Sequence, residues 1–277
     1  MRSMLNIRRR IRGVQSTQQV TRAMKMIAQS RLRRSQQQAL TNRAFTEAVW
    51  DAIQEIGSHQ VNSRFWHPSQ EGKPCYVVIG ADKGLSGPYN SNILRSFLDS
   101  HQSSQGINVI VGRRLESQLR FRGISVDYYE DSGDMPDLEQ AVRLADFVLP
   151  LYQQGEVGAV TLVYTKFINI LKREVRTVKL LPLDELRQSK ARQDLLWEPS
   201  EEAVFASLVH HYVTSLIYNG LLEGKASELA ARMVAMDNAT DNAEQMIKDL
   251  TQQYNQARQA SITQEISEIV GGAEALR

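Results

Sequence analysis

The sequence predicts an α/β fold plus a long α-helical coiled coil, in which an amino-terminal helix and a carboxyl-terminal helix pair antiparallel. Two observations carry this prediction. Small and apolar residues near the carboxyl end recur at alternating spacings of three and four, the heptad pattern of a coiled coil. In the middle of the chain, short β-type runs alternate with helical segments, which favours a Rossmann-like, mostly parallel sheet covered by helices.

The carboxyl-terminal helix is predicted from an uninterrupted seam that contains neither Pro nor Gly. Its residues are Ala226, Leu229, Met233, Met236, Thr240, Ala243, Ile247, Leu250, Tyr254, Ala257 and Ser261. At about 1.5 Å per residue this window spans roughly 50 Å, so the helix needs a partner over much of its length. Ser200 is the expected N-cap, followed by Glu201 and Glu202 in the first turn.

The amino-terminal helix is predicted from about Leu5 to Ile56 and is the natural partner. Its expected seam is Ile7, Ile11, Val14, Thr17, Thr21, Met24, Ala28, Ser35, Ala39 and Asn42. The other face is basic, and no acidic residue precedes Glu47. The basic residues are Arg2, Arg8, Arg9, Arg10, Arg12, Arg22, Lys25, Arg31, Arg33, Arg34 and Arg43. Such a face can be a solvated surface, a nucleic-acid or membrane arm, or a contact for an acidic protein. We favour the acidic protein over nucleic acid because this segment has no aromatic stacking residues.

The middle of the chain supplies the sheet. Five strands are expected at Cys75–Ile79, Ile107–Val111, Ile124–Tyr129, Val157–Tyr164 and Arg176–Leu181. Helices are expected at Ser91–Ser100, Arg113–Arg122 and Leu138–Gln153, the last capped by Asp137. The short link before the fifth strand makes it antiparallel to the fourth. The chain is thus predicted to comprise a helix in 1–60, an α/β foot domain in 70–195 and a helix in 200–277.

Sites for catalysis, cofactors or metals are not expected. The turn from Gly80 to Asn90 follows a strand, but its glycine spacing is wrong for a dinucleotide fingerprint, so we interpret it as a structural turn rather than a phosphate site. Gly72-Lys73 and Gly224-Lys225 lack the Ser or Thr of a phosphate loop, and the five histidines show no zinc spacing. Cys75 opens an apolar run and is expected to be buried. No apolar run is long enough to span a bilayer.

Both ends of the chain closely resemble the gamma subunit of F-type ATP synthases. The first match runs from Ile7 through Thr17-Gln18-Gln19-Val20-Thr21-Arg22-Ala23-Met24-Lys25-Met26-Ile27-Ala28 to Arg34, and the second from Tyr254 to Val270. Tyr164-Thr165-Lys166-Phe167 and Leu181-Pro182-Leu183 resemble the central region of the same family. One departure is Ser86-Gly87-Pro88-Tyr89-Asn90, where the family usually has a Cys-Gly-Gly turn, so the subfamily, including one coupled to sodium, stays open.

The resemblance implies a non-catalytic rotor subunit, one copy per complex, that transmits torque between an ion-driven membrane ring of c subunits and three alpha and three beta subunits. ATP is then made or hydrolysed on beta, and epsilon is a further partner. Residues carried over as contacts to alpha or beta are Arg8, Arg9, Arg12, Met24, Lys25, Arg258, Gln259, Thr263 and Glu268. The implied location is peripheral, at the cytoplasmic face of a bacterial plasma membrane.

Two other interpretations are compatible with the residues alone. A basic coiled-coil protein that binds nucleic acid would use the same arginine-rich face, and its affinity would fall steeply with salt. A nucleotide-dependent α/β enzyme would need a bound cofactor in the central domain, for which the sequence shows no fingerprint.

Overall fold

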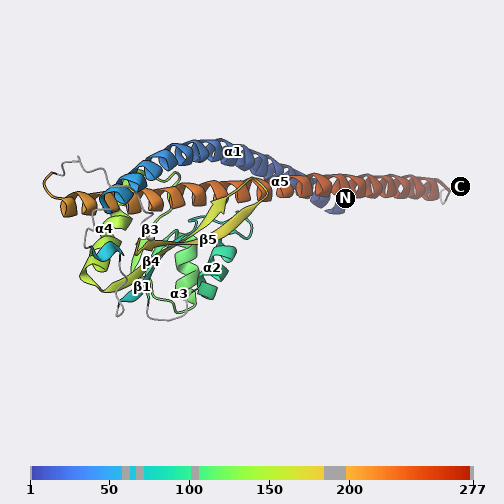
Figure 1. Cartoon of the computed structure of the whole chain (residues 1–277). Coiled ribbons are helices and arrows are strands. Elements are labelled where there is room, and N and C mark those ends of the chain that lie inside the picture. The colour runs from blue at the N-terminus through green and yellow to red at the C-terminus, as the bar shows by residue number, and fades with distance from the viewer. Residues whose placement is uncertain (1, 58–62, 67–71, 101–105, 184–197, 275–277) are drawn as a thin grey trace. The chain divides into compact units, whose positions relative to one another are not determined.

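A computed structural model describes residues 2–57, 63–66, 72–100, 106–183 and 198–274 (Figure 1). The chain divides into two compact units, residues 1–28 with 233–277, and residues 29–232. Two long helices contribute to both units, α1 (Arg2–Gly57) and α5 (Glu201–Glu274). Ser200 caps α5 as predicted, because its Oγ accepts a hydrogen bond from the Ala203 N–H at 3.2 Å.

The unit of residues 29–232 contains the predicted sheet, whose strand order is β3-β2-β1-β4-β5. The strands are β1 (Lys73–Ile79), β2 (Ile107–Val111), β3 (Tyr128–Glu130), β4 (Val157–Phe167) and β5 (Arg173–Leu181). All neighbouring pairs are parallel except β4 and β5, which confirms the predicted antiparallel last strand. The third strand begins later than predicted. The N–H of Ile124 bonds back to Leu119 at the end of α3, so only residues 128–130 pair with β2.

Helices cover both faces of this sheet, as the sequence predicted (Figure 1). The helices α2 (Tyr89–Ser100) and α3 (Arg113–Phe121) pack on one face around Phe97 and Ile110. The helix α4 (Leu138–Gln154), the first part of α5 and the end of α1 pack on the other, and a short 3-10 helix, η1 (Arg64–Trp66), adds Phe65 to that core. Asp137 caps α4 as predicted, accepting the Gln140 N–H at 2.7 Å.

The unit of residues 1–28 and 233–277 is a pair of helical segments with a narrow seam. Every predicted seam residue of α5 from Met233 to Ser261 is buried or half-buried. Across the seam, the hydroxyls of Thr21 and Thr240 share a hydrogen bond of 2.8 Å. Small residues and threonines therefore bring the two backbones close, as predicted.

The predicted seam of α1 was wrong at Thr17 and Met24, which are exposed. The partly or fully buried residues here include Ile7, Ile11, Val14, Gln18, Thr21, Lys25 and Ala28. Their spacing alternates strictly between four and three, so helix geometry selects Gln18 and Lys25 although they are more polar than Thr17 and Met24. The aliphatic stems of long polar side chains can cover a seam while their heads reach water.

Candidate functional site

The residues predicted to contact partner subunits lie in the unit of residues 1–28 and 233–277, and all but one are exposed. The exposed ones are Arg8, Arg9, Arg12, Met24, Arg258, Gln259, Thr263 and Glu268. Lys25 differs, because its Nζ lies 2.5 Å from Oδ1 of Asp237 in an ion pair between the two helices. The positive charge of Lys25 is therefore already compensated within the chain, whereas Arg8, Arg9 and Arg12 form no ion pair with another described residue.

The last turns of α5 also carry exposed apolar side chains, which the sequence analysis did not single out. Residues 262–270, which contain the predicted contacts Thr263 and Glu268, are all exposed and include four apolar side chains. These are Ile262 at 47%, Ile266 at 56%, Ile269 at 72% and Val270 at 56% exposure. Apolar side chains gathered on an exposed helix typically mark a contact surface for another protein. Their spacing of four, three and one on an otherwise polar helix was the available signal.

Residues 221–230 of α5 have the opposite environment, since every one of them is buried. We call this segment the collar section. Gly220, just before it, and Gly224, within it, allow close approach to the sheet. A Cβ at Gly220 would lie 2.9 Å from Leu162, and one at Gly224 would lie 3.1 Å from Ile79. A larger side chain at either position would push the helix away from β1 and β4.

Hydrogen bonds hold the collar section from several sides. Ser35 of α1 donates to the Leu222 carbonyl at 2.8 Å, and the Tyr89 hydroxyl donates to the Gly224 carbonyl at 3.0 Å. In the other direction, Ser227 of α5 donates to the Thr165 carbonyl of β4 at 2.9 Å. Because hydrogen bonds are directional, these contacts specify both the height and the rotation of α5 within residues 29–232.

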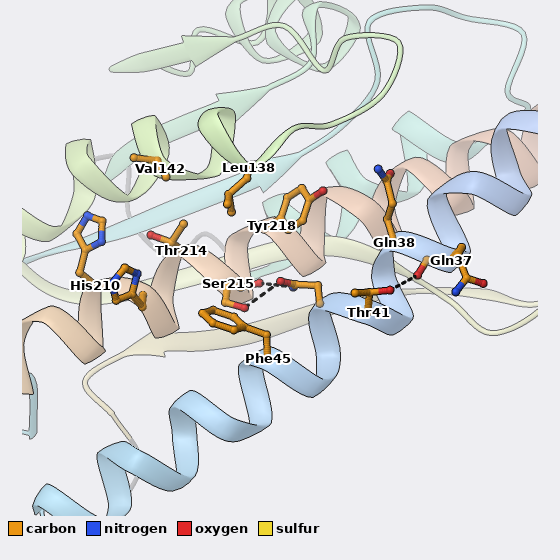
Figure 2. Close-up of a pocket in the computed structure, with 12 residues that line it drawn as sticks. Gln37, Gln38, Thr41, Phe45, Leu138, Val142, His210, Thr214, Ser215 and Tyr218 are labelled. Carbon is orange, nitrogen blue, oxygen red and sulfur yellow. Dashed lines mark hydrogen bonds between the residues drawn. The ribbon is translucent and has the colours of Figure 1, made fainter.

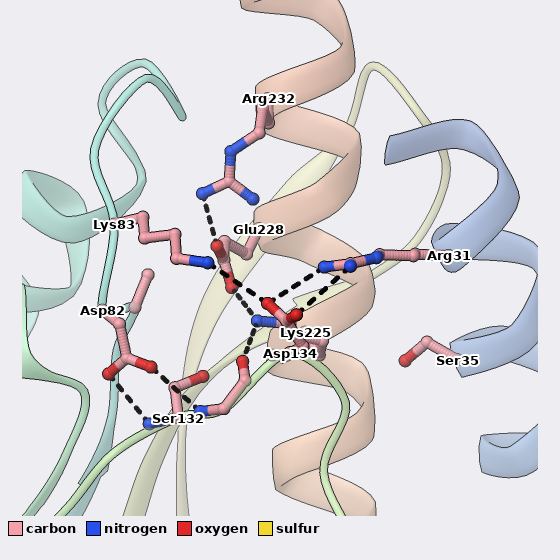
Figure 3. A network of polar contacts seen from close by, with 12 residues as sticks. Arg31, Ser35, Asp82, Lys83, Ser132, Asp134, Lys225, Glu228 and Arg232 are labelled. Carbon is pink, nitrogen blue, oxygen red and sulfur yellow. Dashed lines mark hydrogen bonds and ion pairs between the residues drawn. The ribbon is translucent and has the colours of Figure 1, made fainter. Parts of the chain in front are cut away.

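Three charged residues of α5 extend this arrangement, and we call them the clasp (Figure 3). Lys225 donates to Glu228 Oε2 at 2.9 Å and to the Gly133 carbonyl at 2.7 Å. Arg232 donates to Glu228 Oε1 at 2.5 Å and to the Gly84 carbonyl at 3.3 Å. Glu228 is 2% exposed and Lys225 is 6% exposed. Buried charges of this kind need every partner they have, because water no longer compensates them.

The loop that the clasp contacts is itself fixed by Asp82, in the turn after β1 (Figure 3). The Asp82 carboxylate accepts the backbone N–H groups of Arg113, Ser132 and Gly133, each at 2.9 Å. The amide oxygen of Asn90 accepts the Ala81 N–H at 3.0 Å. The Asp82 carboxylate and the Asn90 amide oxygen thus bond to the backbone of the turn itself and of neighbouring segments, which favours the structural interpretation of this turn.

Asp134 extends the loop's contacts to α1. Its carboxylate pairs with Arg31 of α1 at 3.0 Å and with Lys83 at 3.2 Å. Hydrogen bonds from Arg31 and Lys83 hold the pKa of Asp134 below its usual range. Both long helices are therefore tied to the same short loop, α1 through Asp134 and α5 through Gly133.

Two further buried groups show how strongly this region is removed from water. Burial raises the pKa of Glu223, whose carboxylate lies 3.5 Å from the guanidinium of Arg43. Burial also raises the pKa of Tyr164 to about 12, with a contribution from Glu223. Cys75 is buried as predicted, and burial raises the pKa of its thiol to about 12, so it is an inert core side chain.

A groove of about 760 Å³ lies between α1, α4 and α5 in residues 29–232 (Figure 2). Its walls include Phe45, Leu138, Val142 and Tyr218, and none of its lining residues is Asp, Glu, Lys or Arg. Among the described residues, the Thr214 hydroxyl and the Gln38 amide oxygen find no hydrogen-bond partner, although both atoms are buried. His210 at the rim contacts Asp146 at 2.7 Å. The surface of the groove is thus mainly apolar and carries no Asp, Glu, Lys or Arg side chain. Two buried polar atoms in its wall have no hydrogen-bond partner among the described residues.

Within the described part of the chain, no group of three or more His, Cys, Asp or Glu is arranged to hold a metal ion. Of the helices that could be searched there, none is both long and apolar enough to cross a bilayer.

Comparisons with known proteins agree over the whole chain. The family model described as ATP synthase matches residues 3–276. The protein named ATP synthase gamma chain from Pelotomaculum thermopropionicum is 40% identical over 283 residues and covers all of both chains. The protein of the same name from Moorella thermoacetica is 40% identical over 282 residues, again with full coverage of both.

Solved structures give the same result for the fold. The central stalk and c-ring structure of Tetrahymena thermophila mitochondrial ATP synthase contains a chain that matches at a TM-score of 0.62 and 25% identity, covering 79% of this chain and 99% of that one. A chain of the Euglena gracilis mitochondrial ATP synthase rotor matches at 0.66 and 19% identity, covering 94% and 99%. The latter likeness concerns the fold alone.

Proposed function

This chain belongs to the ATP synthase gamma family and has the central-stalk role of that family, and from this premise we propose how its two units divide the work. The unit of residues 29–232 grips α5 at the collar section, and the exposed faces of residues 1–28 and 233–277 contact the catalytic subunits. Torque then passes along α5 between the membrane ring of c subunits and the alpha and beta subunits. The observation that best supports this proposal is that α5 is one 74-residue helix, which is buried throughout residues 221–230 and exposed throughout residues 262–270.

The chemistry of ATP belongs, in this proposal, to beta, and the chain is non-catalytic by itself. It would be present in one copy per complex and peripheral to the cytoplasmic face of a bacterial plasma membrane. The absence of a metal cluster among the described residues is compatible with this division but carries no weight of its own. What supports it is that, in the turn after β1, the Asp82 carboxylate, the Asn90 amide oxygen and the Ala81 N–H already bond within the chain.

We assign the exposed arginines Arg8, Arg9 and Arg12 to an acidic surface on beta, and the polar residues near the carboxyl end to further contacts with alpha and beta. Met24, Arg258, Gln259, Thr263 and Glu268 are the residues concerned. Met24 supports this assignment, because it is 37% exposed instead of lying in the seam. Exposed charges steer association and tolerate sliding better than a deep apolar lock, which suits a surface that must pass several partners in turn.

We assign the groove between α1, α4 and α5 to the epsilon subunit. Its size and its mainly apolar lining, which contains no Asp, Glu, Lys or Arg, fit an apolar protein surface. A Tyr218→Ala variant should weaken retention of epsilon when the complex is purified. Retention of epsilon equal to that of the parent chain would count against this placement.

The test of the rotor proposal uses the tagged full-length chain expressed with its native partner subunits. The purified complex should contain alpha, beta, epsilon and c subunits, and it should couple ATP hydrolysis to ion uptake in vesicles. Charge reversal of Arg8, Arg9 and Arg12 to Glu should reduce coupled activity, because the contact with an acidic surface becomes repulsive.

Reversal of three exposed arginines in α3 and at its C-cap, Arg114, Arg120 and Arg122, is the matched control, since it changes net charge equally at another surface. Equal loss of coupling in both triple variants would show that net charge alone matters. A complex that forms without the chain, and couples without it, would overturn the proposal.

A further inference from the structure

We propose that the clasp of Lys225, Glu228 and Arg232 is a torque-bearing connection between α5 and the rest of residues 29–232, which acts beside the hydrogen bonds of Ser35, Tyr89 and Ser227. In this view the three are positioning residues, which fix the rotational angle and the height of α5. When the helix rotates, the rest of residues 29–232 then rotates with it by nearly the same angle. This inference rests on the proposed rotor function and assigns the transfer of torque to specific side chains.

Apolar contacts and hydrogen bonds differ in how strongly they resist rotation of α5. The apolar contacts of the collar section, such as those of Leu221, Leu222 and Leu229, are non-directional and depend chiefly on buried area. Such contacts oppose separation of the helix from the sheet but resist a small rotation weakly. The clasp is different, because its hydrogen bonds from Lys225 to the Gly133 carbonyl, at 2.7 Å, and from Arg232 to the Gly84 carbonyl, at 3.3 Å, weaken steeply with misalignment. The bonds to Glu228 lie within α5 and orient these two cationic side chains. A small turn of α5 therefore strains the clasp before it exposes any apolar surface.

The clasp connects α5 to more than one part of residues 29–232. Lys225 bonds to Gly133 and Arg232 bonds to Gly84, so the clasp joins α5 to two separate loops beside the sheet. The first of these loops is held by Asp82 through the N–H groups of Ser132 and Gly133. It also carries Asp134, which pairs with Arg31 of α1. Load on α5 is thus shared with α1 and with the loop that follows β1 (Figure 3).

A gain in folding free energy is a poor explanation for the buried charges of the clasp. Burying ionised groups has a large desolvation cost, and replacing a buried ionic network by apolar residues of similar volume is often neutral or stabilising. Glu228 and Lys225 are nearly inaccessible to water, so this cost applies to them. The clasp is therefore poorly explained as a source of folding free energy and well explained as a source of fixed geometry.

The experiment follows from that contrast and uses the assembled complex. The apolar variant carries Lys225→Met, Glu228→Leu and Arg232→Met, which keep volume but remove the directional bonds. We expect it to assemble and to melt no lower than the parent complex, yet to lose ATP-driven ion uptake relative to ATP hydrolysis. Uptake is measured in vesicles for H⁺ with a pH-sensitive dye and for Na⁺ with a radioactive tracer. In single-molecule rotation, the angular fluctuations of the stalled rotor should increase.

The matched control removes a partly exposed ion pair from α3, with Glu116→Gln and Arg120→Gln, and should leave both the uptake ratio and the fluctuations unchanged. Unchanged coupling in an assembled, folded apolar variant would overturn the inference, and so would an equal loss in the control. If the apolar variant does not fold, Asp134→Asn decides the question. This side chain is 61% exposed, so its loss costs little stability but frees the loop from Arg31 and Lys83.

Asp134→Asn should lower the uptake ratio, and a parental ratio would overturn the inference. The parent complex is measured first. If it neither assembles nor pumps ions, the rotor proposal itself fails, which is a different outcome from failure of the clasp.

Discussion

Helix α5 passes through two contrasting environments. Residues 221–230 are buried on every side and bond to α1, α2 and β4, whereas residues 262–270 are exposed on every side. The first segment contains two buried carboxylates and a buried lysine, and the second contains four exposed apolar side chains. Each segment thus reverses the usual distribution of polar and apolar residues.

The reversal indicates different tasks for the two segments. Buried charged groups that are held by directional hydrogen bonds, such as Lys225 and Glu228, fix one geometry, and this suits a segment that must not move within its surroundings. Exposed apolar side chains without a partner in the chain suit a segment that meets other subunits. A single helix can therefore be anchored at one section and serve as a bearing surface at another. Substitutions in the densely packed residues 29–232 and in the pair of helical segments should therefore differ in their effect on stability.

The largest expected effect is the loss of a core aromatic side chain from residues 29–232. Phe205 is 1% exposed and packs on Phe65 and Trp66, so Phe205→Ala should lower the free energy of unfolding by about 3–5 kcal/mol. Leu250→Ala, in the two-helix seam, should cost about 2 kcal/mol because an open seam collapses more easily around a cavity. Urea unfolding of the purified chain, followed by tryptophan fluorescence and by circular dichroism, measures both. Equal losses would contradict the contrast in packing.

Gly224 gives the next largest effect. In Gly224→Val, the Cβ would lie 3.1 Å from Ile79, and the extra methyl groups would crowd the Tyr89 hydroxyl, so we expect a loss of about 1–3 kcal/mol. Gly13→Ala on α1 is the paired control, because no atom lies within 4 Å of its Cβ position. This second change should stabilise the helix by about 0.5–1 kcal/mol. Thermal melting of both variants is sufficient, and a tolerated valine would mean that α5 is not tightly apposed to β1.

The threonine pair of the helical seam should show a smaller coupling. Thr21 and Thr240 share a hydrogen bond across the seam, and each also lies within bonding distance of a carbonyl in its own helix. Thr21→Val and Thr240→Val should each cost about 1 kcal/mol, and the double variant should cost less than the sum by about 0.5–1 kcal/mol. A double-mutant cycle from denaturant midpoints measures this. Strict additivity would show that the two hydroxyls do not interact.

Glu223 predicts a pH dependence. Because burial raises its pKa in the folded chain, the folded state holds this proton more tightly than the unfolded state, whose pKa is near the ordinary value of about 4.3. Its contribution to stability is therefore complete below that value and declines as pH rises through the folded-state pKa. Glu223→Gln should remove this decline. The free energy of unfolding of the variant, relative to that of the parent, should therefore increase from acidic to neutral pH. Parallel stability curves for the two proteins would contradict the assignment.

Much of the fold was predictable from local pattern. The alternation of short apolar runs and helical segments predicted the five strands, and Asp137 and Ser200 predicted two helix starts that the structure confirms. The seam of α5 was predicted residue by residue, because heptad spacing is set by helix geometry. The error at Thr17 and Met24 arose because apolar character was given more weight than spacing. Lys25 was predicted as a partner contact, and only the structure shows its ion pair with Asp237.

The sequence by itself determined the two long helices, the strand types and the basic face, since each follows from periodicity and charge along a single segment. Only the tertiary structure decided that Lys225 meets the loop at Gly133 and Arg232 the loop at Gly84, and that Asp82 holds the first of these loops. These contacts join residues about 50 to 150 positions apart, and one polar side chain can find many possible partners at such separations. Periodicity records which face of a helix is covered, whereas the identity of what covers it depends on how the distant segments pack.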